Sequence, residues 1–166
     1  PYAVTKSTIE DYSRVFNDTY GLKTIGLRYF NVFGPRQSPE GAYAAVIPRW
    51  EDAFKNDQEI HIYGDGKTSR DFCYIDNVVQ ANILAATASN EAKNNIYNIA
   101  LGKQTSLNEL FDIMKNIIHT KSTPYSKQPI YRDFREGDIR HSNANISKAT
   151  KMLHYDPQVT LERGLS

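Results

Sequence analysis

Tyr2 and Lys6 are the first residues of the chain whose types and spacing could perform acid–base chemistry. Positions i and i+4 of a helix lie on one face, with Cβ atoms roughly 5–6 Å apart, so an ammonium group can lie beside a phenol. An ordinary tyrosine, with a pKa near about 10, is a poor base at neutral pH, and a nearby cation favours the phenolate. The pair can therefore form a general base, although the 11 tyrosines of the chain make a chance pairing on a surface helix the simpler explanation for this pair alone.

Arg70 and Arg135 are the candidate anion-binding residues. A guanidinium fork matches a pyrophosphate bidentately, and because the formal net charge is only +1, any anion recognition has to be local. Either arginine could instead be a solvated surface residue, and Arg140 could be structural or a phosphate neighbour. Asp138 could accept a hydrogen bond from a ribose hydroxyl, or could cap a turn.

The composition argues against several classes of protein. With 40% hydrophobic and 23% charged residues the chain is globular, and no apolar run reaches the roughly 18 residues of a membrane helix. Lysines and arginines form no block, which argues against a nucleic-acid partner. Cys73 is the single cysteine, and the four histidines lack zinc-like spacing, so we expect no metal and a reducing, cytoplasmic location.

Alternating helix and strand patterns must position these residues, as expected for a parallel α/β sheet. Helices are predicted at 2–20, 45–57, 76–89, 105–118, 145–155 and from 160. Gly21 would end the first, Asp76 would be the N-cap of the third, and the fourth would be entered through Thr105 or Ser106. Strands are predicted at 23–30, at 95–101, at 129–134 and as two short strands around the Gly-Asp-Gly turn of 59–75. The loop 31–43 has the length and composition of a functional loop.

Five segments, "YAVTK", "LRYFNVFGPRQ", "AAVIPRW", "IYGDGKTSRDFCYIDNVVQA" and "FREGDIRHSNANISKA", occur in one order along the chain. Together they resemble the extended short-chain dehydrogenase/reductase family, most closely its NAD-dependent nucleotide-sugar 4-epimerases of the UDP-N-acetylglucosamine type. The resemblance covers essentially the whole chain. Because the glycine-rich dinucleotide fingerprint is absent, the chain is expected to be the C-terminal half of such an enzyme.

The resemblance implies an α/β fold: the C-terminal part of a Rossmann-like doubly wound parallel sheet, plus a smaller mixed α/β substrate-binding domain. Residues 1–30 would complete the NAD-binding domain and carry the catalytic helix and its following strand. Residues 31–166 would form mainly the substrate-binding domain, with elements around 69–100 returning to the Rossmann domain.

The family's catalytic roles would fall on the start of the chain. Tyr2 would remove the proton of the sugar 4-hydroxyl while hydride passes from C4 to NAD⁺, giving a 4-keto intermediate that turns over and is reduced on its other face. Lys6 would hold the nicotinamide ribose and lower the pKa of Tyr2. Tyr29 and Val32 would lie beside the nicotinamide, and Asn31 at the substrate phosphates. The third catalytic member, a Ser or Thr, would lie upstream of this chain.

The same resemblance implies a set of substrate contacts, with alternatives for some members. A Trp on a helix is more often a core or interface residue than a ligand contact, and Tyr29 could equally be a core residue. Ser142 would be the gatekeeper at the sugar end, where a small side chain leaves room for an N-acetyl group without requiring one. The predicted substrate-binding residues are Asn31, Ala45, Val46, Trp50, Arg70, Arg135, Asp138 and Ser142.

We therefore expect an NAD-dependent 4-epimerase of a UDP-hexose, with UDP-N-acetylglucosamine favoured and UDP-glucose possible. The rival activities are a nucleotide-sugar 4,6-dehydratase and a UDP-glucuronate decarboxylase, which share the Tyr/Lys pair. An alternative of another class is a non-catalytic nucleotide-sugar-binding module or a partner-completing subunit. The family also implies a homodimer with helix 2–20 at the contact, and an isolated chain without activity.

Overall fold

The computed structural model describes residues 2–41, 45–121 and 125–166, which form alternating helices and short strands. The helices are α1 (Tyr2–Tyr20), α2 (Val46–Lys55), α3 (Ile75–Ala86), α4 (Leu107–Lys121), α5 (Ser147–Leu153) and α6 (Leu161–Leu165), with a 3-10 turn at Asn90–Ala92. The strands are β1 (Ile25–Tyr29), β2 (Val32–Phe33), β3 (His61–Tyr63), β4 (Ser69–Arg70), β5 (Cys73–Tyr74), β6 (Asn95–Ile99), β7 (Thr105–Ser106) and β8 (Ile130–Arg132).

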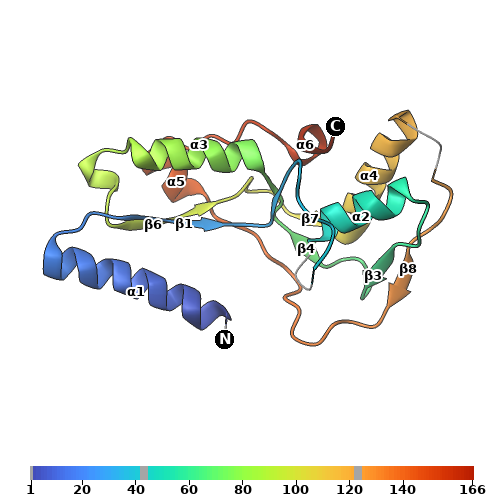
Figure 1. The fold of residues 1–166 in the computed structure, drawn as a ribbon, viewed down its shortest axis with the longest axis horizontal. Helices are drawn as coiled ribbons and strands as arrows, with labels where there is room; N and C mark the ends of the chain where they lie inside the picture. Colours follow the sequence, from blue (N-terminus) through green and yellow to red (C-terminus); the bar gives the residue numbers. More distant parts are fainter. Residues whose placement is uncertain (1, 42–44, 122–124) are drawn as a thin grey trace.

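Three of the four pairings between the described strands are parallel, which confirms the predicted α/β class. β1 runs parallel to β6, with Ile25 opposite Asn95 and Tyr29 opposite Ile99. β2 is parallel to β5 and β3 is parallel to β8, whereas β4 and β7 are antiparallel. Helices α3 and α5 lie on one side of the β1–β6 pair and α1 lies on the other (Figure 1). Helices on both faces of a parallel sheet are the arrangement of a doubly wound fold.

The two strands around the Gly-Asp-Gly turn are present, but they do not pair with each other. β3 pairs with β8 and β4 with β7, so the turn separates two different sheets instead of closing a hairpin. Gly64 has φ +88°, and a Cβ there would lie 2.2 Å from the Phe134 ring. Gly66 has φ +73°, and its Cβ would meet the Asn108 side chain. The glycines therefore let other segments pack directly against this turn.

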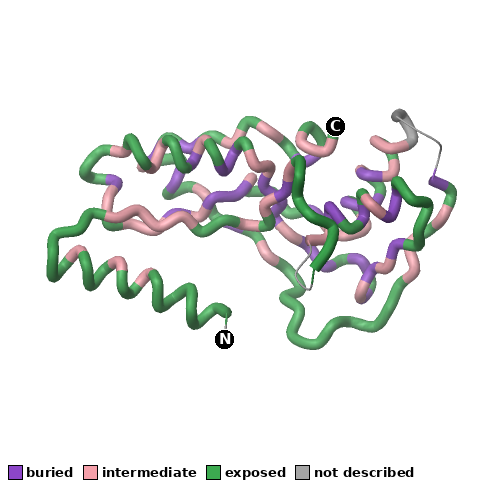
Figure 2. Tube along the Cα trace, viewed as in Figure 1, coloured by how far each residue is buried: buried purple, intermediate pink, exposed green. Residues whose placement is uncertain are grey.

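Two clusters of buried side chains underlie the two parts of the molecule seen in Figures 1 and 2. One lies among α2, α4, β3 and the residues near them, and the other lies under α3 and α5 against β6. The first contains Phe33, Ile47, Trp50, Ala53, Phe54, Ile60, Ile62, Phe72, Leu110, Phe111, Met114, Tyr125 and Leu161. The second contains Cys73, Val78, Ala81, Ala92, Tyr97, Ile99, Ala149, Leu153 and Tyr155. The division of the chain into two domains at residue 30 stays a prediction.

Helix α1 has the predicted bounds and ends where glycine allows it. Gly21 adopts φ +69°, and its N–H donates to the Asn17 carbonyl at 2.8 Å, which closes the last turn. No residue of α1 is buried, and the whole helix is coloured exposed or intermediate in Figure 2. None of the described helices has a stretch long and apolar enough to cross a membrane. The apolar and aromatic side chains exposed on α1 are Tyr2, Val4, Ile9, Tyr12, Val15, Phe16 and Tyr20.

The predicted caps of α3 and α4 have different outcomes. The prediction of Asp76 as the N-cap of α3 is wrong: the cap is Tyr74, and Asp76 lies inside the first helical turn, where its charge still favours the helix dipole. The predicted start of α4 is confirmed. The Ser106 N–H donates to the Glu109 carboxylate at 2.7 Å, and the Glu109 N–H donates to Ser106 Oγ at 3.2 Å, which is a capping box.

Asp71 is fully buried and joins three segments of the chain. Its carboxylate accepts hydrogen bonds from the N–H groups of Leu101 and Gly102, both at 3.0 Å, and of Ala144 at 3.4 Å. Its carbonyl accepts a hydrogen bond from Asn31 Nδ2 at 3.2 Å. Burial raises the pKa of the Asp71 carboxyl, and the N–H groups partly oppose this rise because they stabilise the carboxylate.

Replacing Asp71 by Ala should destabilise the protein by about 2–4 kcal/mol, because three backbone N–H groups, among them the buried N–H of Ala144, would lose their acceptor. Urea unfolding followed by circular dichroism measures the change. Asp112→Ala, on the exposed face of α4, is the matched control and should change the free energy of unfolding by less than about 0.5 kcal/mol. Equal stabilities of the two variants would contradict the role given to Asp71.

Candidate functional site

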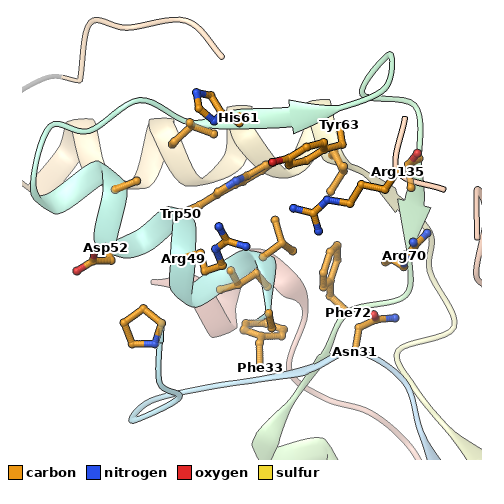
Figure 3. A pocket seen from close by; sticks show the side chains of 18 of the residues that line it. Asn31, Phe33, Arg49, Trp50, Asp52, His61, Tyr63, Arg70, Phe72 and Arg135 are labelled. Carbon is orange, nitrogen blue, oxygen red and sulfur yellow. The ribbon is translucent and has the colours of Figure 1, made fainter. Parts of the chain in front are cut away.

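A cleft of about 460 Å³ lies between α2, β3 and the segments that end at Asn31, Arg70 and Asp138. Phe33 and Phe72, which are 3% and 4% exposed, form part of its apolar wall (Figure 3). The cleft brings together most of the residues predicted to contact substrate, although they are spread over more than 100 positions of the sequence. Those that line it are Asn31, Ala45, Val46, Trp50, Arg70, Arg135 and Asp138, together with Val32.

Arg70 lies at one side of the cleft with its guanidinium already oriented. Its Nη1 donates to the Ser69 carbonyl at 2.9 Å, and its Nη2 donates to Asp138 Oδ1 at 2.6 Å. The Arg70 side chain is only 18% exposed, so these contacts fix it in a largely buried position. Asp138, for which we predicted either a ribose contact or a turn cap, contacts Arg70 in this structure.

A tight turn places Arg135 and Asp138 beside the cleft. The Asp138 N–H donates to the Arg135 carbonyl at 3.3 Å, and Gly137 has φ +76°, the conformation that the third residue of a type II turn requires. The Arg135 guanidinium lies over the Tyr63 ring, 3.8 Å from its centroid. This neighbouring cation lowers the pKa of the Tyr63 phenol, because it stabilises the phenolate.

Helix α2 opens the cleft on another side. Its N-cap, Ala45, makes no side-chain cap, so the first backbone N–H groups of the helix need another partner. Trp50 lines the cleft but is also 6% exposed and packs edge-on against Phe111, with ring centroids 6.2 Å apart. Trp50 is therefore a core residue that also lines the cleft, and its contact with substrate stays a prediction.

Arg49 and Tyr63 line the cleft, and the sequence analysis did not select them. In Figure 3 the guanidinium groups of Arg49 and Arg135 point into the same space from opposite sides. For Tyr63 a sequence signal existed: Ile60, His61, Ile62 and Tyr63 alternate in type along a predicted strand, which places His61 and Tyr63 on the face opposite the isoleucines. Arg49 gives no such signal, because a charged residue in the first turn of a helix is usually a surface residue.

Tyr2 and Lys6 line a second cavity, of about 1030 Å³, between α1 and the β1–β6 pair. Lys6 Nζ lies 5.3 Å from the centroid of the Tyr2 ring, which confirms that the two side chains share one face of the helix. Tyr29 also lines this cavity, and its hydroxyl donates to Asn82 Oδ1 of α3 at 3.0 Å. The structure therefore distributes the predicted residues over two cavities whose linings share no residue and adjoin in the sequence at Phe30 and Asn31.

Ser142 is the predicted residue that lines neither cavity. Its N–H donates to the Ser69 carbonyl at 3.1 Å, next to Arg70, and the neighbouring His141 Nδ1 lies 2.9 Å from Ser69 Oγ. These contacts place Ser142 at the edge of β4. Its role as a gatekeeper stays a prediction.

Replacing Arg135 by Gln should raise the pKa of the Tyr63 phenol toward that of an ordinary tyrosine, because the phenolate would lose its nearest cation. A ¹³C-tyrosine NMR titration measures the pKa, and Tyr63→Phe identifies the signal among the 11 tyrosines. Arg132→Gln on β8 is the matched control, since Arg132 acts on the same phenol more weakly. An equal shift in both variants would contradict the stacked geometry of Arg135.

Comparison with known proteins identifies the family of the chain. A putative UDP-glucose 4-epimerase of Methanocaldococcus jannaschii is 39% identical over 99% of this chain and 50% of its own length. A UDP-glucose 4-epimerase from Thermotoga maritima, solved with UDP-glucose, matches 99% of this chain and 50% of its own, with a TM-score of 0.92 and 41% identity. A UDP-N-acetylglucosamine 4-epimerase from Methanobrevibacter ruminantium was solved with UDP-N-acetylmuramic acid. It matches 99% of this chain and 51% of its own, with a TM-score of 0.90 and 42% identity.

The chain therefore spans about half the length of these relatives. The model of the NAD dependent epimerase/dehydratase family matches residues 1–100, which include α1, α2, α3 and most of the lining of the cleft. This match confirms the resemblance inferred from the sequence and supports NAD as the cofactor. The chain belongs to the NAD dependent epimerase/dehydratase family.

Proposed function

We propose that this chain is the C-terminal half of an NAD-dependent enzyme that epimerises a UDP-hexose at C4. The observation that carries the proposal is the juxtaposition of two features. One is a cleft with arginines on opposite sides and aromatic rings at one end, and the other is an adjacent helix whose Tyr2–Lys6 pair faces a second cavity. A nucleotide sugar needs the first feature for its diphosphate and base, and 4-epimerisation needs the second for its proton transfer.

The substrate is expected to lie with its base at the α2 end of the cleft. Trp50 and Tyr63 provide aromatic surface there, and the uncapped N–H groups at the start of α2 suit a carbonyl or phosphate oxygen. Arg70 and Arg135 would both bind the diphosphate, because guanidinium groups match its paired oxygens. The sugar would then extend past Asn31 toward α1, whose amino-terminal end points to this part of the molecule in Figure 1.

Tyr2 would act as the general base and general acid of the reaction. Its phenolate accepts the proton of the 4-hydroxyl and returns it after the 4-keto sugar has turned over, while the Lys6 ammonium stabilises the phenolate. The exposed phenol and ammonium on one helix face also fit the hydroxyl groups of a dinucleotide ribose. NAD, when bound, supplies the reversible acceptance of hydride from C4. No net oxidation of the sugar results.

The favoured substrate within this class is UDP-N-acetylglucosamine. The support is the small side chain of Ser142, in the position that the family resemblance gives to the sugar end of the pocket. The relatives carry names for both UDP-glucose and UDP-N-acetylglucosamine epimerases, so their likeness supports the reaction more than the sugar. Dehydration and decarboxylation proceed through the same 4-keto stage, and their products distinguish them from epimerisation. A non-catalytic module would bind a UDP-sugar and form no product.

The gene product that contains this chain should convert UDP-N-acetylglucosamine to UDP-N-acetylgalactosamine without added NAD, as followed by proton NMR. Tyr2→Phe should lower kcat by about 100- to 10,000-fold, since the variant lacks the acid–base group. The 166-residue chain by itself should give no product. A 4-keto-6-deoxy signal, or carbon dioxide released from UDP-glucuronate, would reassign the reaction, and binding without turnover of any UDP-sugar would indicate a non-catalytic module.

Replacing Ser142 by Tyr should lower kcat/KM for UDP-N-acetylglucosamine much more than for UDP-glucose, because the larger ring would fill the space of the N-acetyl group. Competition between the two substrates in one reaction measures the ratio directly. Ser142→Ala is the control and should leave the ratio near its wild-type value. A ratio unchanged by Ser142→Tyr would remove Ser142 from the sugar pocket.

A further inference from the structure

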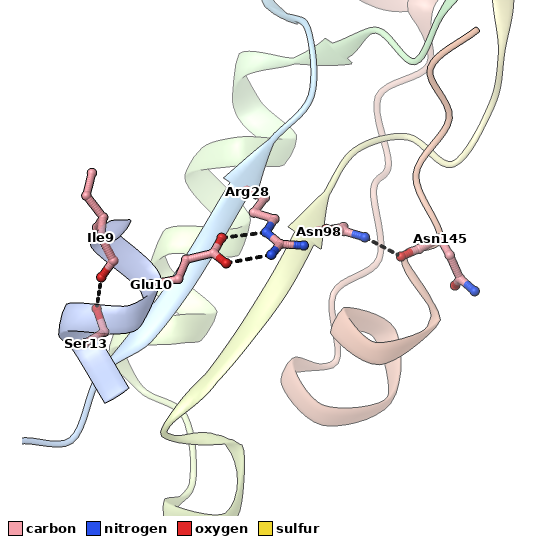
Figure 4. Close-up of polar contacts among 6 residues, drawn as sticks. All are labelled: Ile9, Glu10, Ser13, Arg28, Asn98 and Asn145. Carbon is pink, nitrogen blue, oxygen red and sulfur yellow. Dashed lines mark hydrogen bonds and ion pairs between the residues drawn. The ribbon is translucent and has the colours of Figure 1, made fainter. Parts of the chain in front are cut away.

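Glu10 and Arg28 form a bidentate ion pair between α1 and β1 (Figure 4). Arg28 Nε donates to Glu10 Oε1 and Arg28 Nη2 donates to Glu10 Oε2, each at 2.6 Å. The Glu10 side chain is 24% exposed, and the Arg28 guanidinium lowers the pKa of the Glu10 carboxyl, so the pair is charged at neutral pH. Two parallel hydrogen bonds fix the orientation of both groups as well as their distance.

Among the described residues, this ion pair is the side-chain hydrogen-bonded contact that joins α1 to another element. The other side-chain hydrogen bonds seen on α1, such as that from Ser13 Oγ to the Ile9 carbonyl in Figure 4, stay within the helix. No residue of α1 is buried by the described part of the chain, and Glu10 is one of its few half-buried residues. Within the described residues, this ion pair is therefore the side-chain contact that ties the direction of α1 to β1.

Glu10 continues the row of side chains that begins with Tyr2 and Lys6. The three residues follow at intervals of four along α1, and all three line the cavity between α1 and the β1–β6 pair. At a rise of about 1.5 Å per residue, Tyr2 lies roughly 12 Å along the helix from Glu10. A tilt of about 5° around the ion pair would therefore move Tyr2 by roughly 1 Å.

The strand that carries Arg28 is in turn fixed to the substrate side of the molecule. Arg28 lies opposite Asn98 in the β1–β6 register, and Asn98 Nδ2 donates to the Asn145 carbonyl at 3.2 Å (Figure 4). Asn145 directly follows Ala144, whose N–H donates to Asp71 beside Arg70. Helix α1 is thus anchored to β1, and β1 is joined to the cleft through β6, Asn145 and Asp71.

We propose that Glu10 and Arg28 are positioning residues that hold the Tyr2–Lys6 face of α1 at the distance from the cleft that proton transfer requires. The inference rests on the proposed function of Tyr2. It predicts an effect on turnover rather than on substrate binding, because neither residue lines the cleft. It also predicts that charge alone is insufficient, since an ammonium in place of the guanidinium fork cannot fix the orientation of the carboxylate.

In the full gene product, Glu10→Gln and Arg28→Lys should each lower kcat by about 10- to 100-fold, while KM for the UDP-sugar changes by less than about twofold. The effects of Glu10→Gln and Arg28→Gln should not add in the double variant, and the exchanged pair Glu10→Arg with Arg28→Glu should recover part of kcat. Asp11→Asn is the matched control: Asp11 pairs within α1 to Arg14 at 3.5 Å in an exposed position, and kcat should stay unchanged.

Unchanged kcat in both Glu10→Gln and Arg28→Lys, or an equal loss in Asp11→Asn, would overturn the positioning role. A crystal structure of the Glu10→Gln protein gives a readout that does not depend on turnover: the Tyr2 hydroxyl should move by about 1 Å or more, and an unmoved hydroxyl would also overturn the role. Failure of the proposed function looks different, because Tyr2→Phe would then retain the activity of the wild type.

Discussion

The buried carboxylate of Asp71 is the contact on which the geometry of the cleft depends. It accepts N–H groups from the segment after β6 and from the segment before α5, while its own carbonyl holds the Asn31 side chain at the end of β1. A buried carboxylate is costly unless its oxygens are hydrogen-bonded, so the three segments have to meet at this point for the fold to be stable. Asp71 directly follows Arg70, and the same constraint therefore places a cation of the cleft.

The two proposed halves of the site are held in very different ways. The cleft rests on a buried cluster that includes Phe33, Phe72 and Phe111, and close packing leaves such walls little freedom. Helix α1 has no buried residue and is oriented by the Glu10–Arg28 pair. Within the described residues, the cleft therefore has closely packed walls, whereas α1, the proposed acid–base helix, is joined to β1 by one bidentate ion pair.

Local signals predicted much of the fold, and long-range pairing limited the rest. Three predictions depend on residues within one helical turn: the shared face of Tyr2 and Lys6, the end of α1 at Gly21, and the entry into α4 through Ser106. The structure agrees with each of them. The pairing of β3 with β8 joins residues about 70 positions apart, and no local pattern specifies it. Asp76 was misplaced because β5 leads directly into α3, which moves the cap to Tyr74.

The same contrast holds for the candidate site. Segments recognised as blocks, such as those around Arg70 and Arg135, contributed residues that the fold gathers into one cleft. Arg49 and Tyr63 were missed because their importance depends on which neighbours face them across the cleft, as Arg135 faces Tyr63. Ser142 shows the converse: the family resemblance predicts a pocket residue, whereas its backbone pairs with Ser69 outside the lining of the cleft.

A crystal structure of the full gene product with UDP-N-acetylglucosamine tests the central claim most directly, namely that one ligand spans the cleft and reaches the face of α1. The account predicts the diphosphate in contact with Arg70 and Arg135, the base beside Trp50 and Tyr63, and the sugar 4-hydroxyl within hydrogen-bond distance of Tyr2. A nucleotide bound outside this cleft, or a sugar ring turned away from α1, would contradict it.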